Sequence, residues 1–210
     1  YNNTMIIFTT DNGMFHGSHG LAGKWYPYQE SIRVPLIIYD PRMPKDKVGT
    51  VDDNFTLNVD LAETILGAAG LKPHERMQGR DISDLYLQNR NEGDEDGPTA
   101  LERKPWRDEF FYEFDYVDDE RYIPSSRAVV QKKWKYIDFY NHGHEQLFDL
   151  EEDPLEFTDV KDDVKNSAIV AEMREKLAKY VEDFTEPMEH HLPCARHKDT
   201  YWRAKNPTNN

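Results

Sequence analysis

Residues 5–13 read Met-Ile-Ile-Phe-Thr-Thr-Asp-Asn-Gly, and this stretch decides the fold that we expect. Its first five residues form an unbroken run of apolar and β-branched side chains, which is typical of a strand buried on both faces, as in a parallel sheet. The run ends at Asp11, Asn12 and Gly13. Open α/β sheets build their sites at the C-terminal ends of such strands. The stretch therefore predicts a strand that carries a site.

Two further segments extend this α/β pattern. Residues 33–39, Arg-Val-Pro-Leu-Ile-Ile-Tyr, predict a second buried strand, in which Pro35 is tolerable because it stands near the first residue. Asp60, with a glutamate three residues later, reads as the N-cap of a short core helix that Gly70 and Pro73 end. The expected fold class is α/β, with this part forming the end of a buried mixed or parallel sheet with helices.

The second half of the chain has a different pattern. Aromatic or β-branched residues alternate with polar ones in three segments, which predicts a small antiparallel sheet with one solvated face: residues 109–116, 126–139 and 146–150. Apolar residues at three- and four-residue spacings up to Phe184 predict a helix of about 16 residues, capped by Asn166 or Ser167, that packs across the sheet. The predicted domains are a catalytic α/β part (1–88), a polar boundary (89–105), the sheet and helix (106–186) and a tail (187–210).

Composition limits the ligand classes. The 210 residues contain 40 acidic and 26 basic side chains, for a net charge of −14, which argues against binding a nucleic-acid backbone. An anionic substrate would need locally focused positive charge, for which one series of cations is available: Lys24, Arg33, Arg42, Lys45 and Lys47. No run of 18 apolar residues predicts a membrane span, and the single Cys194 excludes an internal disulfide. Because the chain starts at Tyr1 and runs directly into a strand, we expect the true N-terminus, with any targeting signal, to lie upstream.

The residues that follow the first strand each have an ordinary structural explanation when they are considered one by one. Asp-Asn-Gly is an ordinary turn sequence, a His-Gly step such as that at His19 is more often a loop than a ligand, and a lysine is usually a surface charge. Together they are more informative. Adjacent carboxylate and amide oxygens at Asp11 and Asn12 suit a hard cation such as calcium or magnesium. Lys24, reached through a glycine-rich loop, can return to that cation and place its ammonium beside a sulfate or phosphate oxygen.

The order and spacing of several segments match one known family. They are residues 6–13, His19-Gly20-Leu21, Gly23-Lys24, residues 28–37 and 58–71, Met77-Gln78-Gly79-Arg80, and residues 134–137 and 146–157. The pattern closely resembles the type I sulfatases of the alkaline phosphatase superfamily, over roughly residues 3–185. The resemblance implies that this chain is the C-terminal part of such an enzyme, with the segments after residue 134 forming the family's C-terminal sheet.

The resemblance also implies roles for individual residues. Asp11 and Asn12 match the positions of two calcium ligands, and Lys24 matches the catalytic lysine that contacts the sulfate group. His19 matches a position often filled by histidine, where it either contacts substrate or leaving group or structures the loop. These enzymes use a formylglycine nucleophile made from a Cys/Ser-x-Pro/Ala-x-Arg motif, and Cys194, followed by Ala-Arg-His, does not fit that motif. We therefore expect the nucleophile upstream and the chain by itself to be inactive.

The expected function is hydrolysis of sulfate esters, with a sulfated carbohydrate preferred over a small aryl or choline ester. The first alternative is a phosphoesterase or phosphonate-ester hydrolase of the same superfamily. The second is a non-catalytic carbohydrate-binding or structural module, for which the many aromatic rings of residues 112–140 would suit sugar stacking, although core packing explains most of them more simply. The expected partners are the sulfated ligand and the upstream remainder of the protein, without nucleic acid. Resemblance to the family implies a periplasmic, secreted or lysosome-like location.

Overall fold

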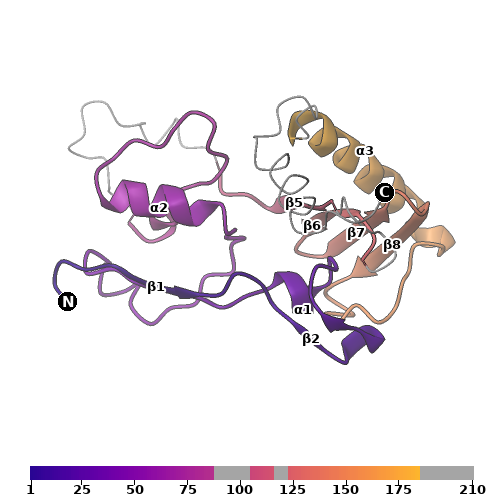
Figure 1. The fold of residues 1–210 in the computed structure, drawn as a ribbon, viewed down its shortest axis with the longest axis horizontal. Helices are drawn as coiled ribbons and strands as arrows, with labels where there is room; N and C mark the ends of the chain where they lie inside the picture. The colour runs from indigo at the N-terminus through magenta and orange to yellow at the C-terminus, as the bar shows by residue number, and fades with distance from the viewer. Residues whose placement is uncertain (88–104, 116–122, 185–210) are drawn as a thin grey trace, which may run out of the picture.

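The computed structural model describes residues 1–87, 105–115 and 123–184. Two lobes follow one another along its longest axis (Figure 1). One lobe holds strands β1 (Ile6–Thr9) and β4 (Leu36–Tyr39) with helix α2 (Asp60–Ala68). The other holds a four-stranded sheet and helix α3 (Ser167–Phe184). The predicted class, α/β with a small antiparallel sheet and a C-terminal helix, is confirmed. The tail, Cys194 and all of the polar boundary except Pro105 lie outside the described residues.

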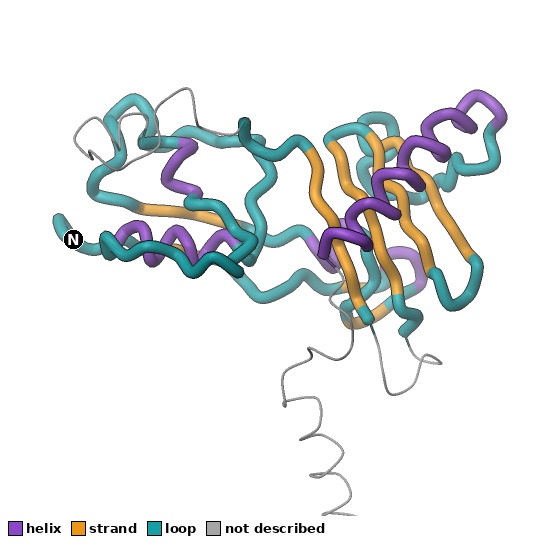
Figure 2. Tube along the Cα trace, turned by 90° about the horizontal axis from the view of Figure 1, so that it is seen from above, coloured by secondary structure: helices purple, strands orange, loops and turns teal. Residues whose placement is uncertain are grey.

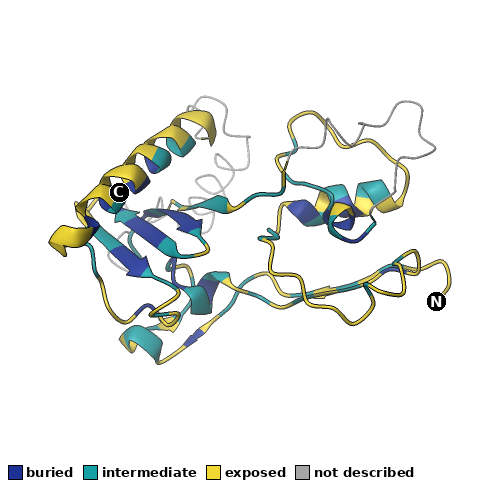
Figure 3. Ribbon diagram, turned by 180° about the vertical axis from the view of Figure 1, so that it is seen from behind, coloured by how far each residue is buried: buried dark blue, intermediate teal, exposed yellow. Residues whose placement is uncertain are grey.

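Strands β1 and β4 form an antiparallel pair, with Ile6 opposite Tyr39 and Thr9 opposite Leu36. Of the two sheet types expected, the pair therefore fits only the mixed one. The two strands are not buried on both faces within the described chain, because alternate side chains are exposed: Ile6 by 44%, Phe8 by 58% and Ile37 by 63%. Figure 3 shows these strands largely outside the buried part of the molecule.

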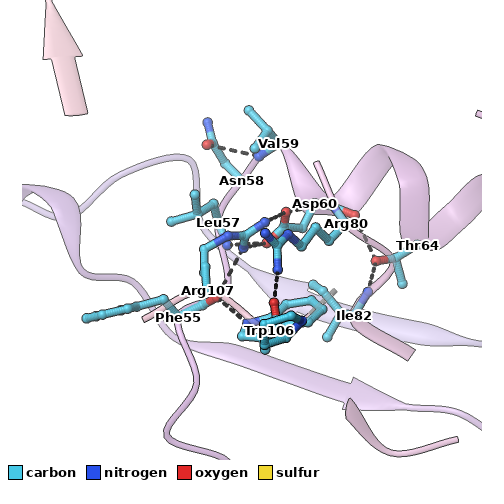
Figure 4. Close-up of polar contacts among 11 residues, drawn as sticks. Phe55, Leu57, Asn58, Val59, Asp60, Thr64, Arg80, Ile82, Trp106 and Arg107 are labelled. Carbon is cyan, nitrogen blue, oxygen red and sulfur yellow. Dashed lines mark hydrogen bonds and ion pairs between the residues drawn. The ribbon is translucent and has the colours of Figure 1, made fainter. Parts of the chain in front are cut away.

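Helix α2 begins at Asp60, so Asp60 is its first residue and Val59 occupies the N-cap position, one residue earlier than expected. The Asp60 side chain is fully buried and bonds outside the helix. It accepts from the backbone N–H groups of Leu57 (2.7 Å) and Arg80 (2.8 Å), and the Arg107 guanidinium binds both of its oxygens at 2.5 and 2.7 Å (Figure 4). This carboxylate joins α2 to the segment that leads into the four-stranded sheet.

The four-stranded sheet has the order β5-β6-β7-β8 and is antiparallel throughout. Its strands are β5 (Glu109–Phe114), β6 (Ser126–Gln131), β7 (Trp134–Phe139) and β8 (His144–Asp149). The predicted segment 126–139 is thus two strands of a hairpin. Helix α3 crosses the sheet diagonally, as expected (Figure 2).

The expectation of one solvated sheet face was wrong, because both faces are covered. On one face, α3 residues Val170, Met173 and Leu177 pack against Val129, Tyr136 and Leu147. On the other face, Phe15 and Tyr28 from the start of the chain pack against side chains that alternate with these, including Ala128, Ile137 and Phe148. The segment directly after β1 therefore forms part of the core of the C-terminal sheet.

That segment contains four short elements, and two more lie later in the chain. They are β2 (Phe15–His16), a 3-10 turn (Ser18–Gly20), β3 (Ala22–Gly23) and α1 (Gln29–Ile32), followed by 3-10 turns η2 (Ile82–Leu85) and η3 (Val164–Asn166). Strands β2 and β3 form a small hairpin in which Phe15 lies opposite Gly23. The hairpin returns the chain toward the end of β1. Among the described residues, no helix is both long and apolar enough to cross a membrane.

Candidate functional site

Asp11, Asn12 and Lys24 lie together at the end of β1. The Lys24 ammonium donates to Asn12 Oδ1 at 2.8 Å and lies 3.7 Å from Asp11 Oδ2. The Asp11 side chain is 83% exposed and that of Lys24 is 30% exposed. The three residues, which were grouped from their spacing and from the family resemblance, therefore share one surface site whose oxygens and ammonium are available to a ligand.

Gly13 fixes the shape of the chain below this site. Its N–H donates to the carbonyl of Ser31 in α1 at 2.8 Å, and its carbonyl accepts from the Asn12 amide at 2.7 Å. A Cβ at this position would lie 2.0 Å from the Glu30 carbonyl oxygen. Only glycine lets the strand end approach α1 this closely.

Trp25 stands next to Lys24 in a strained conformation that sequence reasoning did not single out. Its φ of 83° is in the left-handed region, which is rare for a bulky residue and recurs at functional sites. Two hydrogen bonds of 2.9 Å hold its backbone: its N–H donates to Ser31 Oγ, and its carbonyl accepts from the Tyr112 hydroxyl. The indole remains 45% exposed, and its centroid lies 5.4 Å from the Lys24 ammonium. The sequence offered one signal that could have identified Trp25, namely an aromatic residue directly after the candidate lysine.

His19 is enclosed by aromatic rings. It stacks on Tyr28 with centroids 4.4 Å apart and lies 5.1 Å from the Phe157 ring. Its Nε2 is 3.7 Å from Glu30 Oε2, and neither atom has a hydrogen-bond partner among the described residues. The side chain is only 12% exposed. Both roles left open for His19, a contact with the substrate or leaving group and a part in shaping the loop, stay predictions.

The donor set at the site fits part of a hard-cation centre. Asp11 and Asn12 supply two oxygen atoms of the kind that hard cations bind, and the Lys24 ammonium lies beside both of them. Within the described ranges, no group of three or more His, Cys, Asp or Glu side chains is arranged to hold a metal ion. The two oxygens can contribute to a metal site, and they do not complete one.

Arg42, a second cation of the series named from the sequence, is paired with a carboxylate of its own loop. Arg42 binds Asp40, with Nη2 and Oδ2 2.6 Å apart. Within that series, the contacts of Lys24 with Asn12 and Asp11 place it at the end of β1.

Comparison with known proteins identifies the family. Residues 17–183 match the family model described as "N-sulphoglucosamine sulphohydrolase, C-terminal". The chain belongs to the sulfatases of the alkaline phosphatase superfamily. An arylsulfatase of Clostridium perfringens is 32% identical over 182 residues, which cover 86% of this chain and 34% of that protein. An N-acetylglucosamine-6-O-sulfatase of Bacteroides thetaiotaomicron is 32% identical, over 75% of this chain and 26% of that enzyme.

Solved sulfatase-superfamily structures share the fold. The structure of BT4656 in complex with its substrate D-glucosamine-2-N,6-O-disulfate has a TM-score of 0.73 and 27% identity, and the match covers 88% of this chain and 35% of that one. A phosphonate monoester hydrolase of Agrobacterium radiobacter has a TM-score of 0.70 and 29% identity, over 87% and 36% of the two chains. The chain thus spans 26% to 36% of the length of these relatives. The family model that it matches describes a C-terminal part.

Proposed function

We propose that this chain is the C-terminal part of a sulfatase that hydrolyses sulfate esters of a carbohydrate. The observation that carries the proposal is the meeting of Lys24 with Asp11 and Asn12 at the end of β1, in a chain of sulfatase ancestry. Residues 1–88 would belong to the catalytic α/β domain, and residues 106–186 would form a subdomain that supports it.

In this proposal the ammonium of Lys24 binds a sulfate oxygen and stabilises the negative charge that grows there as the ester bond breaks. A donor aimed at developing charge stabilises the transition state more than the ground state, which raises the rate. Asn12 Oδ1 holds the ammonium in place through the 2.8 Å hydrogen bond. Asp11 and Asn12 would also be two of the ligands of a calcium ion, which supplies Lewis-acid polarisation of the sulfate group when bound.

The nucleophile must come from another part of the protein. No segment of the 210 residues contains the formylglycine motif, so we propose that this chain is inactive without the segment that carries it. The upstream remainder of the protein is then an obligatory partner.

A sulfated carbohydrate is the favoured substrate because of Trp25. An exposed indole beside an anion-binding lysine offers an apolar surface for a pyranose ring next to a charge for its sulfate group. Two similar proteins act on such compounds, as their names state: the N-acetylglucosamine-6-O-sulfatase and BT4656. Similar extracellular sulfatases in Caenorhabditis elegans and Drosophila melanogaster support a location outside the cytoplasm.

The second candidate is a phosphonate- or phosphate-ester hydrolase. It is favoured by the fold shared with the Agrobacterium radiobacter enzyme. Lys24 and the two oxygen ligands would serve either anion, since sulfate and phosphate esters present similar tetrahedral oxygens.

The decisive experiment assays the full-length protein on matched sulfate and phosphate esters of one sugar and identifies the bound metal. Lys24→Ala is expected to lower kcat on the sulfate ester by about 10²–10³, as loss of one transition-state donor does. Lys179→Ala, at an exposed position of α3, is the control and should keep full turnover. Near-normal kinetics for Lys24→Ala would refute its assignment. A preference for the phosphate ester would favour the second candidate.

A further inference from the structure

The lobe that contains the C-terminal sheet has a lysine and a glutamate whose side chains are fully buried. Lys135 in β7 and Glu156 in the loop after β8 both have fully buried side chains, and Nζ lies 2.5 Å from Oε1. Burial lowers the pKa of Lys135, and the neighbouring Glu156 carboxylate opposes that shift. Lysine and glutamate are almost never fully buried unless paired. Both residues belong to the buried interior, whereas the Asp11 side chain of the candidate site is exposed.

The second oxygen of Glu156 reaches the segment that carries the site. Oε2 accepts the backbone N–H of Gln29 at 2.7 Å, across 127 positions of sequence. Gln29 is the first residue of α1, whose own N-cap residue, Tyr28, makes no capping side-chain bond. A helix start leaves N–H groups without partners inside the helix, so Glu156 supplies a cap from a distant part of the chain.

Helix α1 in turn holds both halves of the candidate site through one residue. The Ser31 carbonyl accepts from the N–H of Gly13, directly after Asp11 and Asn12. The Ser31 hydroxyl accepts from the N–H of Trp25, directly after Lys24. A displacement of α1 would therefore change the placement of the two oxygen ligands and of the ammonium together.

We propose that the buried Lys135–Glu156 pair is a positioning device for the active site: Lys135 orients the Glu156 carboxylate, and Glu156 fixes α1 through the Gln29 N–H. The role of this positioning in catalysis rests on the proposed sulfatase function. The contact chain itself does not depend on the reaction.

Stability alone is a weak explanation for this pair. Replacing a buried ion pair by well-packed apolar side chains is often neutral or stabilising. What an apolar pair cannot provide is an acceptor for the Gln29 N–H. If the pair only stabilises the fold, neutral replacements with and without that acceptor should leave α1 equally well placed. If the pair positions α1, only the replacement that keeps the acceptor should do so.

Two double variants of the full-length protein distinguish the positioning role from a role in stability alone. K135Q/E156Q is neutral, allows the two amides to hydrogen-bond, and keeps an acceptor for the Gln29 N–H. K135M/E156M is neutral, apolar and without that acceptor. Both replace unbranched side chains by unbranched ones, including at position 156, where φ is 60°. Thermal unfolding of both variants establishes that each is folded at the assay temperature.

The first readout is amide hydrogen exchange, which needs no activity. We expect the peptide containing residues 25–33 to exchange faster in K135M/E156M than in K135Q/E156Q, with unchanged exchange in α3. The second readout is turnover of a sulfated monosaccharide. We expect kcat to fall by about 10- to 100-fold in K135M/E156M, the range for small misplacements of catalytic groups, and to be largely retained in K135Q/E156Q.

The outcomes test the positioning role of the Lys135–Glu156 pair separately from the proposed sulfatase function. Equal exchange of residues 25–33 in the two variants would overturn the positioning role, whatever the activity. Equal kcat would overturn its catalytic importance. If the wild-type protein hydrolyses no sulfate ester, the proposed function fails, while the exchange experiment still tests the link from Glu156 to α1.

Discussion

At Gly13, shortly after the end of β1, the backbone packs against the backbone of α1 with no room for a side chain. The neighbour that an added Cβ would meet is a backbone carbonyl, Glu30 O at 2.0 Å, so no side-chain rotation can make room for it. The backbones of β1 and α1 would have to move apart, and the hydrogen bond from Gly13 to Ser31 would lengthen.

We therefore expect Gly13→Ala to destabilise the protein by about 1–3 kcal/mol, the usual cost of overpacking, and to impair turnover. Urea unfolding and a sulfate-ester assay measure the two effects. Gly143→Asn is the control, because φ there is 59°, which asparagine tolerates, and an added Cβ would meet nothing within 4 Å. A Gly13→Ala protein as stable as the control would contradict the close-packing argument.

Trp25 offers a second prediction for a single residue. Trp25→Asn removes the indole beside Lys24 and keeps a side chain that accepts a positive φ, so the loop should hold its shape. For the full-length enzyme we expect KM for a sulfated pyranose to rise by about 10-fold, the loss of roughly one ring contact, with less effect on a small alkyl sulfate. Equal effects on both substrates would exclude a ring contact by Trp25.

Helix α3 illustrates how an element is held by charge as well as by packing. Its Arg174 binds Glu145 of β8, and its Lys176 donates to Glu109 of β5 at 2.7 Å. The hydrogen bond from Arg174 lowers the pKa of Glu145. For Glu109, burial alone would raise the pKa, and bonds from Gln131 and Lys176 outweigh it, so the pKa is again lowered.

A lowered carboxylate pKa gives stability that is present above the ordinary glutamate value of 4.5 and is lost as the pH falls through the folded-state pKa. We expect the docking of α3 to be independent of pH near neutrality and to weaken below about pH 4.5. Hydrogen exchange of residues 167–184 between pH 7 and pH 3.5, corrected for the intrinsic rate, measures this. The double variant E109Q/E145Q should lose most of the pH dependence. A dependence that persists unchanged in that variant would assign the acid effect to other groups.

On the scale of the whole molecule, the link between the two lobes depends on Asp60 and Arg107. The Asp60 side chain is fully buried and that of Arg107 is 10% exposed. Next to this pair, the Trp106 indole and the Arg107 guanidinium both donate to the Phe55 carbonyl, at 2.8 and 3.1 Å (Figure 4). The lobe with α2 is thereby connected to the start of β5.

Arg107→Met leaves the Asp60 carboxylate buried without its charged partner. Breaking a buried pair in this way costs about 3–5 kcal/mol, so we expect a clear loss of stability in chemical unfolding. Lys133→Met is the control, because Lys133 pairs with Asp149 and Glu151 at the surface, where its side chain is 43% exposed, and such exposed pairs contribute little to stability. Similar losses in both variants would mean that the Asp60–Arg107 pair does not hold the lobes together.

The sequence by itself determined the features that depend on neighbouring residues. The apolar period of residues 169–184 predicted α3, and alternation predicted the strands of the four-stranded sheet, because helix and strand periods are local. Asp11, Asn12 and Lys24 were grouped from their spacing and from the family resemblance, since a glycine-containing loop can bring Lys24, twelve positions further on, back to Asn12. Their roles as calcium ligands and sulfate contact stay predictions.

Only the tertiary structure decided the antiparallel pairing of β1 with β4, the covering of both faces of the C-terminal sheet, and the partners of Glu156 and Asp60. Glu156 meets Gln29 across 127 positions, and Arg107 meets Asp60 across 47. Such partners share no local period or motif, because they are brought together by packing of the whole chain. The sequence therefore placed the candidate chemistry at the end of one strand, and the fold determined what holds that strand end in place.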